Sequence, residues 1–151
     1  MTDFGLGVIF TITEATTPPA TQEDENVIIR KENADSGTIY EGQVVAVKST
    51  GTGVVQANAS DNTKHAFGIA KTQAAVGVAL DIVTDGVLEI EDWTNTIGTA
   101  NLTPNASYWL STTAGRLTTT PPSTAGQIVQ YVGRALSTTQ LIIEIDPAVL
   151  L

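Results

Sequence analysis

The sequence predicts an all-β protein, a compact antiparallel sandwich or barrel of short strands with an extended N-terminal arm. Three observations favour this fold class. Among the 151 residues there are 24 threonines and 13 glycines, a composition typical of strands joined by tight turns. Apolar residues occur in short runs, and turn signals recur about every 8–12 residues, as in all-β domains. The length sets an expectation of one domain.

The first 25 residues differ from the rest and are predicted to form the arm. Val8, Phe10 and Ile12 alternate with other residues between positions 6 and 13, the period of a strand. Pro18-Pro19 then interrupts any strand pairing, and residues 22–25 are acidic or polar. An ordinary first strand followed by a surface loop is the alternative. No basic region precedes the apolar stretch, so no targeting segment is expected.

Residues 26–151 are predicted to form the β domain from a succession of short strands. Asp85-Gly86 is a strong hairpin signal between two of these strands. Only residues 72–76 have a pattern that weakly favours a helical turn. The expected strands are Val27–Arg30, Gln43–Lys48, Val54–Ala57, Phe67–Ala70, Val78–Val83, Val87–Glu91, Ser107–Leu110, Arg116–Thr118, Ile128–Ala135 and Leu141–Ile145.

A weak internal repeat relates two similar meanders, at about 40–91 and 106–146. Each meander has a strand, a glycine turn, a strand, a loop, a strand with a Gly-x-Ala step, and an exit strand. Gly68-Ile69-Ala70 and Gly133-Arg134-Ala135 are the two Gly-x-Ala steps. Packing two such meanders together would bury an apolar face of each. A chance match among simple strand patterns is the alternative.

Charge and cysteine content exclude several classes of function. Acidic residues outnumber basic ones by 16 to 7, and the resulting net charge of −9 disfavours nucleic-acid binding. The chain contains no cysteine, which excludes disulfides, thiolate metal sites and cysteine nucleophiles. The apolar runs of about four residues are far shorter than the ~20 of a membrane helix, so no membrane partner is expected.

No catalytic motif is visible. His65 is the only histidine, which excludes a metal site built on a histidine pair. It follows Ser60 and Asp61 in a polar loop, but no serine lies in a Gly-x-Ser-x-Gly turn. We therefore expect a solvated loop histidine, no enzyme activity and no cofactor.

The acidic residues near position 90 allow more than one interpretation. Glu89 and Glu91 would share one face of a strand, with Asp81 and Asp85 across the predicted hairpin and Asp92 beside them. Such carboxylates could bind calcium at a subunit interface or serve a glycosidase. The solvent face of an amphipathic strand is the expected alternative, and no metal site is predicted.

Three aromatic residues could form a platform on which a sugar stacks, or could serve a core or a subunit interface. Trp93 follows the acidic strand and is expected to be half exposed. Tyr108 and Trp109 are adjacent on a strand, so they must point to opposite faces. A structural use is the favoured interpretation.

Runs of turn and strand residues in both halves carry a resemblance to known proteins. In the second half these runs are Tyr108-Trp109-Leu110-Ser111, Ala114-Gly115-Arg116-Leu117-Thr118, residues 126–137 and residues 141–145. In the first half they are Glu41-Gly42-Gln43-Val44-Val45, Phe67-Gly68-Ile69-Ala70, Ala74-Ala75-Val76-Gly77 and Asp85-Gly86. The second half resembles β modules of tailed-phage virion proteins, and the first half resembles small capsid decoration proteins. This resemblance covers about residues 40–147 and implies a β-tulip or jelly-roll-like domain, commonly a homotrimer, on the outside of a capsid.

The expected function is therefore that of a cement or head-stabilisation protein, with the major capsid protein and copies of itself as partners. The protein would be made in the host cytoplasm and reside on the virion. A tail-fibre or other appendage domain that binds host receptor glycans is the alternative, and a small carboxylate hydrolase is a third. Apolar side chains outside the predicted core mark the expected capsid or subunit contacts. They are Val8, Phe10, Ile12, Val149, Leu150 and Leu151.

Overall fold

The computed structural model of the chain describes residues 26–151, and the prediction of an N-terminal arm lies outside them. Within this range eleven strands and one short helix follow one another along the chain. They are β2 (Val27–Glu32), β3 (Val44–Val47), β4 (Val54–Gln56), β5 (Gly68–Ala70), β6 (Ala79–Glu89), α1 (Thr94–Ile97), β7 (Ser107–Leu110), β8 (Leu117–Thr118), β9 (Ile128–Val129), β10 (Tyr131–Ala135), β11 (Gln140–Ile143) and β12 (Val149–Leu150).

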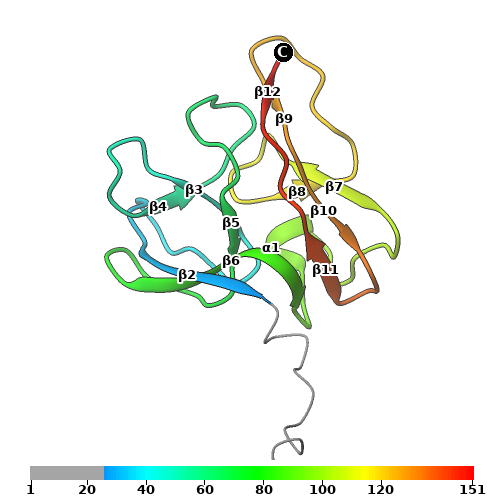
Figure 1. The fold of residues 1–151 in the computed structure, drawn as a ribbon, viewed down its shortest axis with the longest axis horizontal. Coiled ribbons are helices and arrows are strands. Elements are labelled where there is room, and N and C mark those ends of the chain that lie inside the picture. The colour runs from blue at the N-terminus through cyan, green and yellow to red at the C-terminus, as the bar shows by residue number, and fades with distance from the viewer. Residues whose placement is uncertain (1–25) are drawn as a thin grey trace, which may run out of the picture.

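Nine of these strands form one curled antiparallel sheet, a half-barrel, which confirms the all-β prediction. Its order is β4-β3-β5-β6-β11-β10-β7-β8, and β2 pairs with the first part of β6. The remaining strands, β9 and β12, form a two-stranded ribbon that projects from one end of the molecule and carries the C-terminus (Figure 1). The first half of the chain occupies one side of the molecule and the second half the other (Figure 1).

The two halves of the sheet have the same strand order and the same register. β3 lies between β4 and β5 as β7 lies between β8 and β10. Val45 pairs with Gly68 in the first half, and Tyr108 pairs with Gly133 in the second. The sheet is thus built from two units, β2 to the first part of β6 and the last part of β6 to β11, which share β6.

The glycines of the two Gly-x-Ala steps, Gly68 and Gly133, lie where another strand passes very close. A Cβ atom at Gly68 would lie 2.7 Å from the carbonyl oxygen of Val83, and one at Gly133 would overlap the carbonyl oxygen of Ile142. These oxygens belong to strand backbone and cannot move away without breaking the sheet. Only glycine therefore fits at these positions.

We expect Gly133→Ala to lower the free energy of unfolding by about 2–3 kcal/mol, since overpacking against a rigid backbone has this cost. Gly37→Ala is the matched control, because no atom lies within 4 Å of the added Cβ. The control should change stability by less than about 1 kcal/mol. Urea unfolding followed by tryptophan fluorescence measures both variants, and equal midpoints would contradict this packing.

The hydrophobic core has two parts. The larger part lies between the two halves and includes Trp93, Leu110 and Ile143. The smaller part lies on the other face of the first half, around Val45 and Ile82. Because both faces of this part of the sheet are covered, β3 is apolar at consecutive positions instead of alternating.

The buried amide of Gln130 links the first half of the chain to the C-terminal segment. Its Nε2 donates to the carbonyl oxygens of Ala66 and Asp146, at 3.1 and 3.0 Å, and its Oε1 accepts from the amide of Ala66 at 2.7 Å. Gln130 separates β9 from β10, so the strand expected over 128–135 is two strands. All the polar atoms of this buried side chain are thereby satisfied.

The hairpin prediction at Asp85-Gly86 is wrong. β6 runs without interruption from Ala79 to Glu89, and Gly86 has a φ of +105° within it. Up to Asp85 the strand pairs with β2, and from Gly86 onward it pairs with β11. The glycine therefore marks the point at which one long strand passes from the first unit to the second.

The helical turn expected at residues 72–76 is also wrong. Ala74 instead forms an antiparallel bridge with Ile39, with hydrogen bonds of 2.9 and 3.0 Å in the two directions. The one helix among residues 26–151 is α1, which Gly98 ends in the left-handed conformation. A helix this short has no periodicity that a sequence pattern could reveal.

Candidate functional site

Three consecutive apolar side chains are exposed at the end of the C-terminal ribbon, which comprises β9, β12 and Leu151. Val149, Leu150 and Leu151 are 59%, 56% and 44% exposed. β12 pairs with β9, and the amide of Leu151 donates to the carbonyl oxygen of Gln127 at 2.8 Å. The ribbon thus presents apolar side chains on a hydrogen-bonded backbone, the arrangement of a contact surface.

The other predicted contact residues, Val8, Phe10 and Ile12, lie outside the described residues. The sequence analysis places Val149, Leu150 and Leu151 outside every expected strand, whereas the structure pairs two of them with β9. The short strand was missed because two residues provide no alternation to detect.

His65 lies exposed in the loop before β5. Asp61, its candidate partner, is already bonded within the loop, because its Oδ1 accepts from the hydroxyl and the amide of Thr63 at 2.7 and 3.0 Å. Both hydrogen bonds lower the pKa of Asp61, and the bond from the Thr63 hydroxyl has the larger effect. Within residues 26–151 no hydrogen bond joins His65 to Asp61 or to Ser60.

The acidic residues near position 90 do not converge, because the hairpin that would have brought them together is absent. Asp81 pairs with Arg30 at 2.8 Å, at the other end of β6 from Glu89. The carboxylate of Asp92 accepts from the hydroxyl and the amide of Thr94, which lowers the pKa of Asp92. In the part of the chain that the structure describes, no group of three or more potential metal-ligating side chains is found.

Trp93 is fully buried, so the expectation that it is half exposed is wrong. Its Nε1 donates to the carbonyl oxygen of Thr139 at 3.0 Å, in the turn before β11. Tyr108 and Trp109 point to opposite faces, as predicted, and Trp109 packs edge to face on Tyr131 with 5.9 Å between the ring centroids. The three aromatic residues therefore form no common platform.

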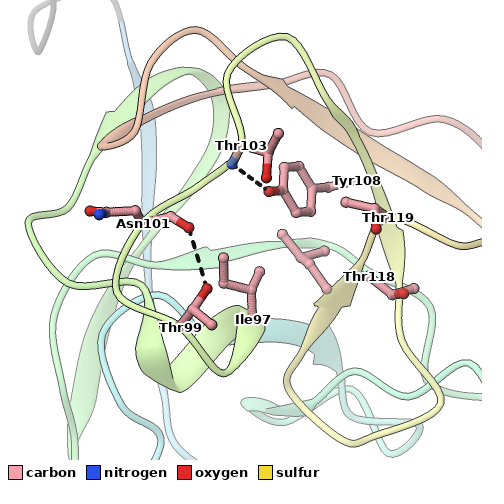
Figure 2. Close-up of a pocket in the computed structure, with 8 residues that line it drawn as sticks. Ile97, Thr99, Asn101, Thr103, Tyr108, Thr118 and Thr119 are labelled. Carbon is pink, nitrogen blue, oxygen red and sulfur yellow. Dashed lines mark hydrogen bonds between the residues drawn. The ribbon is translucent and has the colours of Figure 1, made fainter.

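A polar pocket lies between α1 and the β7–β8 hairpin, with a volume of about 250 Å³. Figure 2 shows Ile97 and Thr99 facing Tyr108 and Thr118 across it. The hydroxyl oxygen of Tyr108 accepts from the amide of Thr103 at 2.9 Å, and its own proton has no acceptor among the described residues. No charged side chain lines the pocket, whose full lining is Ile97, Thr99, Asn101, Thr103, Tyr108, Leu117, Thr118 and Thr119.

Comparison with known proteins finds no protein-family model and no curated protein that matches this chain. Within residues 26–151 the structure contains no helix that is long and apolar enough to span a membrane. Among the described residues, the C-terminal ribbon offers an apolar contact surface and the pocket beside β8 offers neutral polar groups.

Proposed function

We propose that this chain is a structural virion protein that binds the outside of a phage capsid and stabilises it without catalysing a reaction. One observation carries the proposal: Val149, Leu150 and Leu151 are exposed together at the end of the C-terminal ribbon. Its partners are the major capsid protein and further copies of this chain. Its place is the capsid surface, after synthesis in the host cytoplasm.

Two features of the sequence support this proposal. The turn and strand patterns of residues 40–147 resemble capsid decoration proteins, as set out above. The net charge of −9 favours a dispersed, soluble subunit before assembly, because like-charged copies repel one another. Burial of the ribbon's apolar side chains on the capsid would then provide the attraction that overcomes this repulsion.

Replacing the apolar side chains of the ribbon tests this surface directly. We expect the triple variant Val149→Ser, Leu150→Ser and Leu151→Ser to fold normally, since these side chains are exposed. Its affinity for purified capsids should fall at least about tenfold, which corresponds to a loss of ~1.4 kcal/mol of buried apolar contact. Co-sedimentation of the protein with capsids over a range of concentrations measures the affinity.

The matched control for this experiment is a pair of equally exposed valines elsewhere on the surface. Val76 and Val78, 55% and 51% exposed, lie in the loop before β6. The variant Val76→Ser and Val78→Ser should bind capsids as the unmodified protein does. Equal losses in both variants would show a general effect of apolar surface and would contradict a contact through the ribbon.

We further propose that the free protein is a homotrimer, as the resemblance implies. Size-exclusion chromatography with light scattering should give about three times the chain mass of 15.8 kDa at micromolar concentration. Trimer formation would bury apolar surface that is exposed in the single chain. A stable 15.8 kDa monomer over the same concentration range would contradict this part of the proposal.

The second candidate is a virion appendage domain that binds receptor glycans. The pocket beside α1 is the observation in its favour, because neutral hydroxyl and amide groups are suited to sugar hydroxyls. A glycan array separates the candidates. Saccharide binding that is lost in Tyr108→Phe would favour the appendage domain, and no binding together with capsid decoration would favour the decoration protein.

A further inference from the structure

The outer edges of the two units differ in whether another segment of the chain covers them. In the first unit a segment that we call the strap, residues 33–35, runs parallel to β4 and covers its edge. The amide of Ala34 donates to the carbonyl oxygen of Val54 at 2.8 Å, and Oδ2 of Asp35 accepts from the amide of Gln56 at 2.7 Å. The edge of β4 thus has backbone and carboxylate partners within the same chain.

In the second unit the equivalent edge, that of β8, has no strap, and we call it the open edge; Thr119 is exposed there, whereas Leu117 is 4% exposed. The amide of Ser111 donates to the carbonyl oxygen of Arg116 at 2.9 Å, so the backbone groups of Leu117 and Thr119 point away from β7. By register these two residues correspond to Val54 and Gln56 of the first unit. Apart from the pairing of β8 with β7, no hydrogen bond within residues 26–151 reaches the backbone of Leu117 or Thr119.

The second unit has no strap, because the segment between β6 and β7 forms α1 instead. The buried hydroxyl of Thr96 in α1 donates to the carbonyl oxygen of Gly42 at 2.7 Å. This bond holds α1 against the first unit. The polar pocket occupies the space between α1 and β8, so the pocket and the open edge form one continuous feature (Figure 2).

The open edge also has a positive charge beside it. Arg116 directly precedes β8, and its guanidinium group lies near Gly98 at the end of α1. In the described part of the chain Arg116 has no salt-bridge partner, since the two ion pairs found there are Arg30–Asp81 and Lys64–Asp61. A ligand here would meet an unused carbonyl, an unused amide and a cation.

We propose that the edge of β8 receives an extended strand from a second copy of this chain, and that this strand is the N-terminal segment, residues 6–14. The strand would run parallel to β8, as the strap runs parallel to β4. The backbone of the incoming strand would form hydrogen bonds with Leu117. A carboxylate of the strand would accept a hydrogen bond from the amide of Thr119, as Asp35 accepts one from the amide of Gln56. This is strand addition to an exposed edge.

The sequence of residues 1–25 matches these requirements. Val8, Phe10 and Ile12 give the alternation of a strand, and Glu14 follows with a carboxylate. The 25 residues contain five acidic residues and no basic one, which complements Arg116. Fully extended, they span up to about 80 Å, enough to reach a neighbouring subunit.

Residues 6–14 and the edge of β8 are different surfaces, so their contact between two copies would be heterologous. Such contacts close into a ring, such as the proposed trimer, when the rotation between the copies permits it. A peptide strand is favoured over a sugar as the ligand. The open edge of β8 lies beside the pocket, and the equivalent edge of β4 in the first unit is covered by a peptide segment, the strap. This inference rests in part on the proposed trimer, although its test needs no capsid.

Disulfide trapping tests the contact in the full-length protein, which contains no cysteine of its own. Thr119→Cys and Thr13→Cys are made as separate chains, mixed and oxidised under mild conditions. We expect a disulfide-linked pair on non-reducing gels at least tenfold faster than with Thr112→Cys in place of Thr119→Cys. Thr112 is exposed in the same hairpin but lies outside the edge, so it controls for random collisions.

A non-covalent test uses Thr119→Pro. The amide of Thr119 points away from β7, so proline removes the proposed donor and leaves the β7–β8 pairing intact. The concentration at which the trimer dissociates should rise at least tenfold, with no change in circular dichroism. Thr112→Pro, in the turn of the same hairpin, should leave this concentration within twofold of the unmodified value.

The outcomes separate this inference from the proposed function. Equal rates of cross-linking at positions 119 and 112 would overturn it, as would saccharide binding in the pocket without cross-linking. A single chain with both cysteines that closes on itself at high dilution would also overturn it, because the segment would then be the chain's own. A trimer that forms without preferential cross-linking would leave the proposed function standing and this inference refuted.

Discussion

Deleting residues 2–20 should leave the β domain folded and reduce its affinity for capsids at least about 100-fold. The deleted residues lie outside the described residues and precede β2. Residues 27–151 form the nine-stranded sheet and the two core clusters described above, and on this basis the deletion is expected to leave them in place. The melting temperature should therefore change by less than about 3 °C.

The size of this expected loss follows from three side chains. Val8, Phe10 and Ile12 each contribute roughly 1.5–3 kcal/mol when fully buried on a partner. Ordering the segment opposes this gain, at about 1–2 kcal/mol for each residue whose backbone becomes fixed, and backbone pairing with an exposed edge offsets part of that cost. These side chains are proposed to lie on the β8 edge of a neighbouring copy, so the deletion weakens the proposed trimer and removes its avidity for the capsid lattice; a loss of about 3 kcal/mol corresponds to the 100-fold effect.

A length-matched control separates burial from simple tethering. The full chain with Val8→Ser, Phe10→Ser and Ile12→Ser keeps all 151 residues but lacks the apolar side chains. It should bind capsids about as weakly as the deletion does. Deletion without loss of binding would contradict a contact through these residues, and deletion that unfolds the domain would show that residues 6–13 are a strand of the domain itself.

Replacing Trp93 by alanine should lower the free energy of unfolding by about 3–5 kcal/mol, since it leaves a large cavity. Trp93 is fully buried in the larger core cluster. Its carbonyl oxygen accepts hydrogen bonds from the amides of Thr96 and Ile97, which lie in α1. The carbonyl oxygen of Thr139 would keep its bond from the amide of Ile90 and would not be left unpaired. The loss is therefore one of packing.

Trp109→Ala is the control, because Trp109 is half-buried and packs edge to face on Tyr131. Its expected cost is about 1–2 kcal/mol, the contribution of an aromatic pair and partial burial. Urea unfolding followed by far-ultraviolet circular dichroism compares the two variants without relying on tryptophan fluorescence. A smaller loss for Trp93→Ala than for Trp109→Ala would contradict the position of Trp93 in the core.

Strand positions could be predicted from the sequence because each strand has its own local signal. Runs such as Val44–Val47 and Tyr131–Ala135 are apolar or alternating and are bounded by turn residues. Neither signal depends on which strands become neighbours. The two units even share their register, which follows from similar strands and similarly placed glycines.

The predictions that failed are those in which pairing decides the local structure. Asp85-Gly86 has the composition of a hairpin turn, but β2 and β11 together provide partners along the whole length of β6. The strand therefore continues through Gly86. Likewise, Ala74 pairs with Ile39, so residues 72–76 do not form a turn of helix. No short window of sequence contains this information.

The candidate site was predictable only in part. The exposed residues 149–151 stand out as consecutive apolar side chains beyond the last predicted strand. The open edge of β8 could not be predicted, because it results from a segment that is absent there and present beside β4. The edges of β4 and β8 can be recognised as equivalent only when the strand register of both units is known, and the structure supplies this register.

Electron cryomicroscopy of capsids mixed with the purified protein tests the central claim most directly. The capsids are those of the phage that, under the proposed function, encodes this chain, and they are stripped of the protein or assembled without it. We predict additional density on the outer surface at repeated positions of the lattice, into which the half-barrel fits with its C-terminal ribbon toward the shell. Capsids that remain bare at saturating protein, while the protein is folded and trimeric, would contradict the account.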